Sequence, residues 1–416
     1  MTALTATLSA EVIAAALGQF PPTPEQTAVI ESPLEPALVV AGAGSGKTET
    51  MASRVVWLVA NRIVRRDEVL GLTFTRKAAG ELAERIQRRL ARLAEFEARG
   101  LLPHLSELHG TGSLAVFGEL ERSGVDGLKA ALARHEAMDA LAVALGADAQ
   151  EPDDDALLHR PTVSTYNSFA DQIVREHAVR IGRDAEAVVL SESAAWLLMR
   201  RVVFASDDPR LESRGEAVRS IIDAALRIAR DGVDNLVDLD VLAAFPDRFT
   251  TVLSLPSTNA RTVVYADVLA AEEKVGALAM LADLAREYAT EKRRLGVIDF
   301  SDQVAGALEV IASSAAVADE LRERYRVVLL DEYQDTSVVQ TDLLAALFAG
   351  TGVMAVGDPH QAIYGWRGAS AGNLGGFPLA FSAGGSCRHF ALLTSWRNSA
   401  AVLTAANAVL APLAAS

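Results

Sequence analysis

The sequence predicts an α/β fold built on a parallel β-sheet, and two observations support this prediction. Six short apolar runs are distributed along the chain, and the residues that could carry chemistry directly follow several of them. Long stretches with helical character separate these runs, as in strands joined by helical crossovers. Ligands bind outside the carboxyl ends of parallel strands, so we expect the functional residues at one edge of the sheet. The predicted strands are residues 37–41, 69–73, 161–165, 326–330, 352–356 and 389–393.

The first predicted strand leads into the glycine-rich segment ALVVAGAGSGKT, residues 37–48. Glycines lack Cβ atoms, so successive backbone N–H groups can form a concavity for phosphate oxygens, and the following helix adds its positive N-terminal dipole. Lys47 supplies an ammonium group for the phosphates and Thr48 a hydroxyl for Mg²⁺. Ala41 occupies a place where the strict motif has glycine, and the alternative is a turn without a nucleotide. The segment predicts an ATP site formed by Ala43, Gly44, Ser45, Gly46, Lys47 and Thr48.

A second apolar strand ends in two adjacent carboxylates within VVLLDEYQDT, residues 327–336. In a phosphate-loop hydrolase, the first carboxylate holds the magnesium shell and the next orients and deprotonates the attacking water. Asp331 and Glu332 fit these two roles. The alternative is an acidic pair that only complements a helix N-terminus.

The segments between the strands predict the remaining organisation. Residues 80–94 read as an amphipathic arginine-rich helix, and residues 95–160 as an insertion rich in alanine and glycine. Residues 190–290 are mostly helical in pattern. Residues 368–386 resemble a connector into a further domain because glycine and alanine dominate them.

Several ordered motifs together resemble those of UvrD/Rep-type superfamily 1A DNA helicases. LLDEYQDT and VGDPHQAIYGWRGA resemble motifs II and III, and TPEQ, TFTRKAA, STYNSFA and LLTSWRNS resemble the Q motif and motifs Ia, Ib and IV. The resemblance covers nearly the whole chain. The wording of TFTRKAA, STYNSF and TSWRNS is most similar to the AdnB subunit of actinobacterial AdnAB helicase–nucleases.

The resemblance implies a RecA-like phosphate-loop domain with a parallel sheet, an inserted helical domain and the start of a second RecA-like domain. We expect domain 1A at 1–189 and 291–383, the mainly helical domain 1B at 190–290, and the beginning of domain 2A at 384–416.

The resemblance also assigns nucleotide-binding roles. Gln26 is expected at the adenine edge, although Thr23 and Gln26 also form a capping-box pattern with proline at the first helical position. Trp396 stands where the family usually stacks a tyrosine on adenine. Gln361 resembles the glutamine that senses the γ-phosphate. Arg397 resembles the arginine that reaches the γ-phosphate, where a guanidinium stabilises transition-state charge, and Arg367 is expected to pair with Glu332 or with the phosphates.

Single-stranded DNA contacts follow from the same resemblance. Aromatic faces stack on any base, and cationic side chains contact the backbone. For the aromatic residues the alternative is a packed core. In motif Ib an asparagine replaces the histidine of many relatives, and a DNA contact by Thr165, Asn167 or Phe169 is expected there. The expected DNA-binding residues are Phe74, Arg76, Lys77, Thr165, Asn167, Tyr364 and Trp366.

Bulk composition limits the function classes. The formal net charge of −15 argues against a simple nucleic-acid binder, so a positive groove must be local. We expect the arginines from 85 to 92 to form a solvated helix face. Apolar runs stay well below the ~18 residues of a membrane span, and the single cysteine, Cys387, fits a reducing, cytoplasmic location.

The resemblance implies an ATP- and Mg²⁺-dependent 3′→5′ DNA translocase or helicase acting in recombination or double-strand-break repair. Its expected partners are single-stranded and duplex DNA and a second helicase–nuclease subunit, with no membrane. The alternatives are an ATP- and DNA-binding module without motor activity and a generic kinase or GTPase. No segment resembles motifs V and VI, so we expect a truncated product that binds nucleotide weakly, hydrolyses it poorly and unwinds nothing, with residues after about 386 poorly anchored.

Overall fold

A six-stranded sheet forms the centre of the protein, with strand order β3-β2-β6-β7-β1-β8 and every neighbouring pair parallel. The computed structural model describes residues 7–123, 127–147, 159–213, 217–255, 264–363 and 372–414. The strands are β1 (Ala37–Ala41), β2 (Val69–Thr73), β3 (Thr162–Thr165), β6 (Val327–Leu330), β7 (Gly352–Gly357) and β8 (Arg388–Leu392). All six strands lie where the sequence predicts them, within one residue at most bounds, which confirms the α/β prediction.

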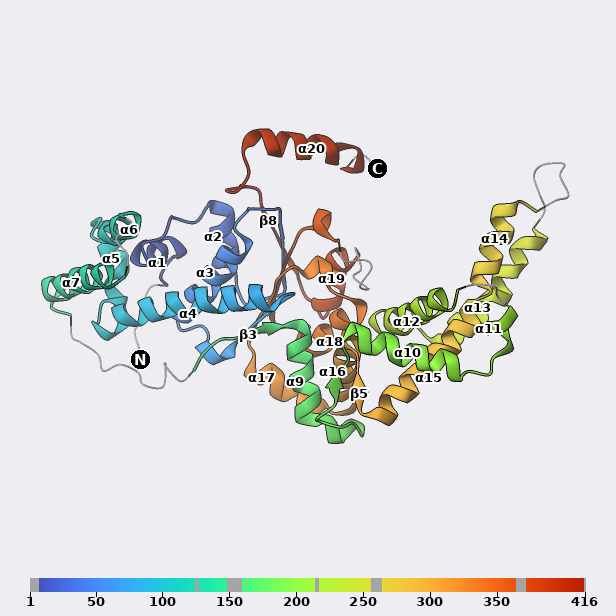
Figure 1. The fold of residues 1–416 in the computed structure, drawn as a ribbon. Helices are drawn as coiled ribbons and strands as arrows, with labels where there is room; N and C mark the ends of the chain where they lie inside the picture. The colour runs from blue at the N-terminus through green and yellow to red at the C-terminus, as the bar shows by residue number, and fades with distance from the viewer. Residues whose placement is uncertain are drawn as a thin grey trace.

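The two faces of the sheet are buried under separate helix layers (Figure 1). Side chains alternate along a strand, so Val327 and Leu329 enter one apolar cluster and Val328 and Leu330 enter the other. The central strands are therefore apolar throughout, as expected for a parallel sheet covered on both sides.

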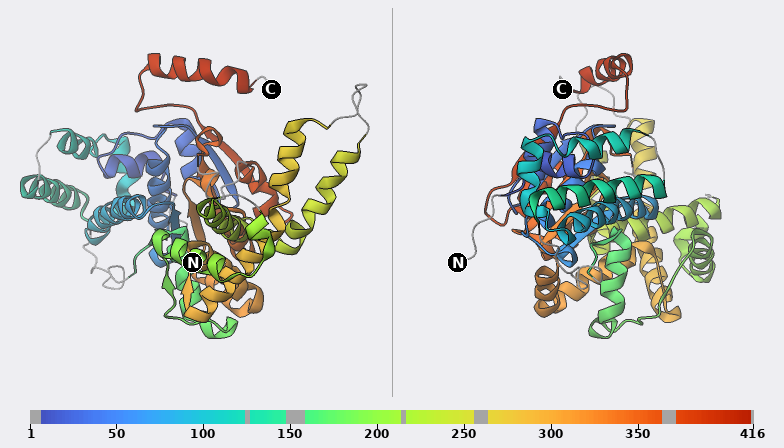
Figure 2. Two further views of the ribbon diagram at one scale, coloured as in Figure 1. Left: turned by 45° about the vertical axis from the view of Figure 1, so that its right-hand side comes forward. Right: turned by 90° about the vertical axis from the view of Figure 1, so that its left-hand side faces the viewer.

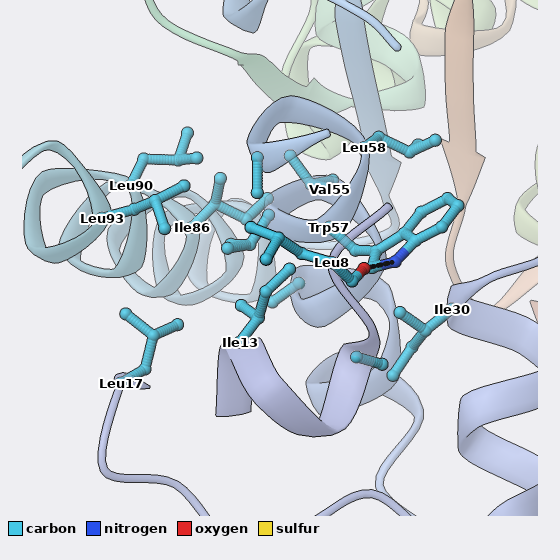
Figure 3. Close-up of a cluster of buried hydrophobic side chains, with 14 of the residues drawn as sticks. Leu8, Ile13, Leu17, Ile30, Val55, Trp57, Leu58, Ile86, Leu90 and Leu93 are labelled. Atoms are coloured by element: carbon cyan, nitrogen blue, oxygen red, sulfur yellow. Dashed lines mark hydrogen bonds between the residues drawn. The ribbon is translucent and has the colours of Figure 1, made fainter. Parts of the chain in front are cut away.

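Helices from the N-terminal part of the chain cover the first face. The cluster beneath them includes Leu8, Trp57 and Leu90, and the Trp57 indole donates a 2.8 Å hydrogen bond to the Leu8 carbonyl (Figure 3). This bond ties the segment before the first helix to the helix that follows β1. The helices are α1 (Ala10–Ala16), α2 (Pro24–Ile30), α3 (Lys47–Ala60) and α4 (Arg76–Ala98).

The expected insertion is helical and joins this layer. Leu105, Phe117 and Met138 are buried in the same cluster as α1 and α4. Figure 1 shows these helices grouped at the end of the molecule beside α1. The helices are α5 (Leu105–Gly110), α6 (Ala115–Arg122) and α7 (Leu128–Leu145).

The expectation of a solvated arginine face on α4 is wrong for Arg89. Its side chain is only 7% exposed, donates to Ser53 Oγ at 3.0 Å and is ion-paired with Glu49. Residues 86 and 90 of α4 are core positions, so Arg89 lies close enough to the sheet-facing side to be covered by α3.

The second face is covered by α9 (Tyr166–His177), α16 (Phe300–Ser313), α17 (Ala315–Arg324), α18 (Val338–Phe348) and α19 (Asn373–Phe381). The prediction of a connector at 368–386 is wrong for α19. Phe377 and Phe381 are fully buried and stack with ring centroids 4.6 Å apart, and Phe377 also meets Tyr333 edge-on. Glycine and alanine around these aromatic residues conceal an apolar helix face in the sequence.

A helical arm projects from this side of the molecule (Figures 1 and 2). It has its own apolar cluster, which includes Met199, Ile222 and Tyr288. Its helices are α10 (Glu192–Ala205), α11 (Pro209–Ser213), α12 (Val218–Asp234), α13 (Leu239–Thr250), α14 (Ala266–Val275) and α15 (Leu278–Leu295). A two-stranded parallel sheet of β4 (Val188–Val189) and β5 (Val297–Ile298) joins the arm to the body.

The expectation of poor anchoring after residue 386 is wrong for β8. This strand pairs with β1 over five residues, and Leu392 is buried. The domain boundary expected at 384 therefore does not separate β8 from the main sheet. Beyond it, α20 (Ala400–Ala414) lies apart from the body, with Val402 and Val409 exposed (Figures 1 and 2).

Short 3-10 helices complete the described structure. They are η1 (Arg66–Glu68), η2 (Leu102–His104), η3 (Ala178–Ile181), η4 (Thr251–Ser254), η5 (Tyr333–Asp335) and η6 (Pro359–Gln361).

Candidate nucleotide-binding and DNA-binding site

The glycine-rich turn between β1 and α3 has the backbone shape expected of a phosphate loop. Gly44 and Gly46 adopt φ angles of +76° and +84°, in the left-handed region that side chains other than glycine rarely occupy. Gly46 is also pressed against Gln26, because a Cβ added to Gly46 would lie 2.8 Å from Gln26 Nε2. The α3 helix begins at Lys47 directly after this turn, so its N-terminal N–H groups face the region where an anion is expected.

The segment after β8 closes on the outside of this turn. Ser395 Oγ and Asn398 Nδ2 donate to the Ala43 carbonyl at 3.2 and 3.4 Å, and the Trp396 N–H donates to the Gly44 carbonyl at 2.9 Å. These donors occupy carbonyl groups of the turn. The structure thus brings two residues predicted from motif IV, Trp396 and Arg397, to the phosphate loop. The Trp396 side chain is 68% exposed.

Gln26 lies in the first turn of α2, beside the phosphate loop. Its Oε1 accepts from the Thr23 N–H at 3.0 Å, and the Gln26 N–H donates to Thr23 Oγ1, so the capping box is confirmed. Its Nε2 lies 3.5 Å from the Ser45 carbonyl. The adenine contact of Gln26 stays a prediction.

The two predicted catalytic segments meet at the carboxyl edge of the sheet. Lys47 Nζ lies 3.0 Å from Glu332 Oε2, and the two side chains are 11% and 37% exposed. The contact forms because β7 alone separates β1 from β6 in the sheet. Glu332 has a φ of 49°, an uncommon conformation for a residue with a side chain, so its surroundings hold it in place.

Asp331 lies deeper than Glu332, with 6% of its surface exposed. Its Oδ1 accepts from the Glu332 N–H at 3.0 Å. Burial and the adjacent Glu332 charge raise the pKa of Asp331 to about 6, and Lys47 opposes this rise. A nearby cation would lower the pKa of Asp331 again.

All the predicted DNA-binding residues that the structure describes, except Lys77, line one large groove of about 1870 Å³. On the body side Phe74, Arg76, Thr165 and Asn167 line it, and on the arm side helices α10 and α12 do so. Phe74 is half-buried and meets Tyr166 edge-on with ring centroids 6.5 Å apart, so the packed-core alternative holds for part of its surface. Lys77 is exposed, and its Nζ lies 3.8 Å from Glu81 Oε1.

Motif Ib is more tightly engaged within the protein than the sequence predicts. Thr165 caps α9 through its hydroxyl. Asn167 Nδ2 donates to the Phe300 carbonyl and Asn167 Oδ1 accepts from Gln340 Nε2, both at 3.0 Å. Phe169 is 3% exposed within the core, so the expectation that it contacts DNA is wrong.

The last part of motif III lies outside the described residues, which resume at 372. The predictions for Tyr364, Trp366 and Arg367 fall there. Gln361, at the end of η6, donates from Nε2 to Asp358 Oδ2 at 2.5 Å.

Sequence reasoning did not identify Gln334 and Asp358 as parts of the site. Both are buried, and Gln334 Oε1 accepts from the Asp358 N–H at 3.0 Å. Their positions inside motifs II and III were the available signal, but local sequence does not reveal a hydrogen bond across strands.

Among the described residues, no cluster of three or more His, Cys, Asp or Glu side chains is arranged to hold a metal ion. No helix in the described part of the chain is long and apolar enough to cross a membrane.

Comparison with known proteins agrees with this geometry. The UvrD/REP helicase N-terminal domain model matches residues 22–381. The chain is 24% identical to DNA helicase II of Haemophilus influenzae over 92% of its own length and 39% of the relative's. It is 26% identical to the ATP-dependent DNA helicase PcrA of Leuconostoc citreum, over 93% and 38% of the two lengths.

A third relative is the RecBCD enzyme subunit RecB of Mycobacterium tuberculosis, at 28% identity over 89% of this chain and 29% of that protein. The chain thus spans about two fifths or less of these relatives. With a family match over most of its length, the chain belongs to the UvrD/REP helicase N-terminal domain family.

Proposed function

We propose that this chain is the ATP- and DNA-binding part of an ATP-dependent 3′→5′ DNA translocase or helicase that acts in recombination or double-strand-break repair. The observation that carries the proposal is the contact between Lys47 and Glu332, which joins a phosphate-loop lysine after β1 to a carboxylate at the end of β6, one strand beyond β7. The groove that begins at Phe74 and Arg76 gives the same edge of the sheet a surface for a nucleic-acid strand.

The residues at this edge fit ATP with Mg²⁺. The positive-φ glycines form a turn that a Cβ would obstruct, and Lys47 supplies its cation. Thr48 and Asp331 would hold the metal ion, which neutralises phosphate charge when bound. Because the described residues form no metal cluster of their own, the phosphates would supply further ligands.

Glu332 is suited to act as the general base. Its carboxylate is partly exposed, while Asp331 beside it is buried and has a raised pKa. The two carboxyl groups therefore differ in environment: Glu332 is accessible to a water molecule, whereas the charge of a metal ion at the buried Asp331 would offset the cost of its burial. Arg397 and Gln361 would contact the nucleotide phosphates, and Trp396 and Gln26 the base.

DNA binding would use stacking and backbone charge. Phe74 offers a half-buried aromatic face, and Arg76 and Lys77 are exposed cations at the same end of α4. Such a surface is tolerant of base sequence and sensitive to salt. Tyr364 and Trp366 would add stacking positions, Thr165 and Asn167 would contact the strand from motif Ib, and a second helicase–nuclease subunit is the proposed protein partner.

The test measures ATP·Mg²⁺ and single-stranded oligonucleotide binding by the 416-residue chain, and then unwinding of tailed duplexes by the whole protein. The proposal expects both ligands to bind, ATP in preference to GTP, and unwinding only from 3′ tails. Binding of both ligands without any DNA-stimulated hydrolysis by the whole protein would favour the alternative, a module without motor activity. Absence of nucleotide binding would refute both.

A further inference from the structure

Gln334 is a buried polar residue for which the proposed chemistry so far has no use. It lies in η5, directly after the carboxylate pair, and is 2% exposed. Its Nε2 donates to Glu332 Oε2 at 2.9 Å and to Asp335 Oδ2 at 3.2 Å, while its Oε1 accepts from the Asp358 N–H at 3.0 Å. Every polar atom of the side chain thus has a partner.

The arrangement requires an amide at this position. Two carboxylates accept from the nitrogen, and a backbone N–H donates to the oxygen, so neither a carboxylate nor an apolar side chain satisfies all three partners. Gly357 leaves the space that the Gln334 side chain fills, because a Cβ at Gly357 would lie only 2.5 Å from Gln334 Oε1. A buried polar group with complete partners holds its neighbours in one geometry.

Gln334 connects two groups of functional residues. On one side, Glu332 accepts from both Gln334 and Lys47, at 2.9 and 3.0 Å. On the other side, the Asp358 carboxylate accepts from the Gln361 side chain and from the His360 N–H. These contacts form one continuous chain, which we call the relay: Lys47–Glu332–Gln334–Asp358–Gln361.

The position of β7 explains why the relay is short. This strand lies between β1 and β6, so the turn that follows it, η6, starts between the phosphate loop and the carboxylate pair. Gly42 is close to this turn, because a Cβ added there would lie 3.9 Å from Asp358 Oδ2.

We propose that Gln334 is a positioning residue that transmits nucleotide capture by Lys47 to the η6 turn. Lys47 Nζ has three N–H donors and gives one of them to Glu332, so nucleotide phosphates would share the ammonium group with Glu332 and thereby weaken the Lys47–Glu332 contact. Glu332, held at a φ of 49°, then changes its contacts, and Gln334 passes this change to the Asp358 N–H. The nucleotide thereby favours one arrangement of η6 over another. This inference rests on the proposed function, since it needs a nucleoside triphosphate at the phosphate loop.

Hydrogen–deuterium exchange on the 416-residue chain tests the proposal, with and without saturating ATPγS and Mg²⁺. The readout is the exchange of the amides in 355–361, which include the Asp358 N–H. Gln334→Met keeps the side-chain length and removes the amide. Gln334→Glu keeps the acceptor for Asp358 and removes both donors, and it serves as the second variant if the first does not fold. Nucleotide affinity is measured for each protein in parallel.

The control is Asn373→Ala, which removes a hydrogen bond between the start of α19 and Thr336, the residue directly after η5. Asn373 Nδ2 donates to the Thr336 carbonyl at 2.7 Å, and within the described part of the chain no hydrogen bond joins Asn373 to a residue of the relay. A variant that merely loosens the loop should leave the nucleotide effect on exchange in place.

In the wild type and in Asn373→Ala, we expect ATPγS to change exchange at 355–361 by about fivefold or more. In both Gln334 variants we expect nucleotide to bind with this change lost. Nucleotide binding with the change retained in either Gln334 variant, or absent from the wild type, would overturn the relay while leaving the proposed function intact. Absence of nucleotide binding to the wild type would instead overturn the proposed function, and the relay with it.

Discussion

Lys47 and Glu332 are 285 residues apart in sequence, and Lys47 Nζ lies 3.0 Å from Glu332 Oε2. The contact places the phosphate-loop cation and the candidate base at the carboxyl edge of one parallel sheet. It also pairs each group with the other, so that substitution of either changes the environment of both.

Glu332→Gln should leave nucleotide binding largely intact and remove hydrolysis, because an amide fills the site but cannot accept a proton from water. General-base catalysis contributes about 10²–10⁴-fold, so turnover should fall by that order in a form of the protein that hydrolyses ATP. Phosphate release measures turnover, and Glu81→Gln, an exposed carboxylate on α4, is the control. Retained turnover in Glu332→Gln would show that another group is the base.

Asp331 should make stability depend on pH between about 4 and 6. Its folded-state pKa of about 6 exceeds the ordinary value of 3.8, so the folded chain binds the proton more tightly. Stability therefore falls as pH rises through this interval, by about 2 kcal/mol at pH 7 relative to pH 4. Denaturant unfolding of wild type and Asp331→Asn at several pH values isolates this contribution, because the asparagine variant lacks it. Equal pH dependence in the two proteins would contradict the assignment.

Phe74→Leu should weaken single-stranded DNA binding by about 1–3 kcal/mol, with little dependence on base sequence. Leucine preserves most of the apolar packing against Tyr166 but removes the aromatic face. Fluorescence anisotropy of labelled oligonucleotides measures the affinity. Phe20→Leu is a control, because Phe20 is exposed and lies outside the groove. A drop in melting temperature with unchanged DNA affinity would mean that Phe74 serves the core alone.

The strands could be predicted from sequence because each is a short apolar run followed by residues with a recognisable chemistry. Both cues are local. The helix α19 was missed because Phe377 and Phe381, which stack in the core, are surrounded by glycine and alanine that are typical of a loop. β8 was placed correctly but assigned to a separate domain, since its pairing with β1 involves residues about 350 positions apart.

The candidate site likewise contains residues that local sequence predicts and contacts that it does not. Lys47 and Glu332 were predictable because their motifs specify chemistry by local spacing. The bonds of Gln334 to Glu332 and Asp358 were not, because a hydrogen bond between two strand ends depends on strand order. The internal partners of Asn167 were likewise hidden, since they come from α16 and α18.

The central claim is that the turn from Gly42 to Thr48 binds the phosphates of ATP and that Lys47 is its cation. Isothermal titration of ATP·Mg²⁺ into the wild type and Lys47→Ala tests it most directly, with Arg88→Ala, a surface substitution on α4, as the control. A charge-assisted contact of this kind contributes about 1.5–3 kcal/mol, so we predict that Lys47→Ala binds about tenfold or more weakly and that Arg88→Ala binds like the wild type. Equal ATP affinity in the wild type and Lys47→Ala would contradict the account.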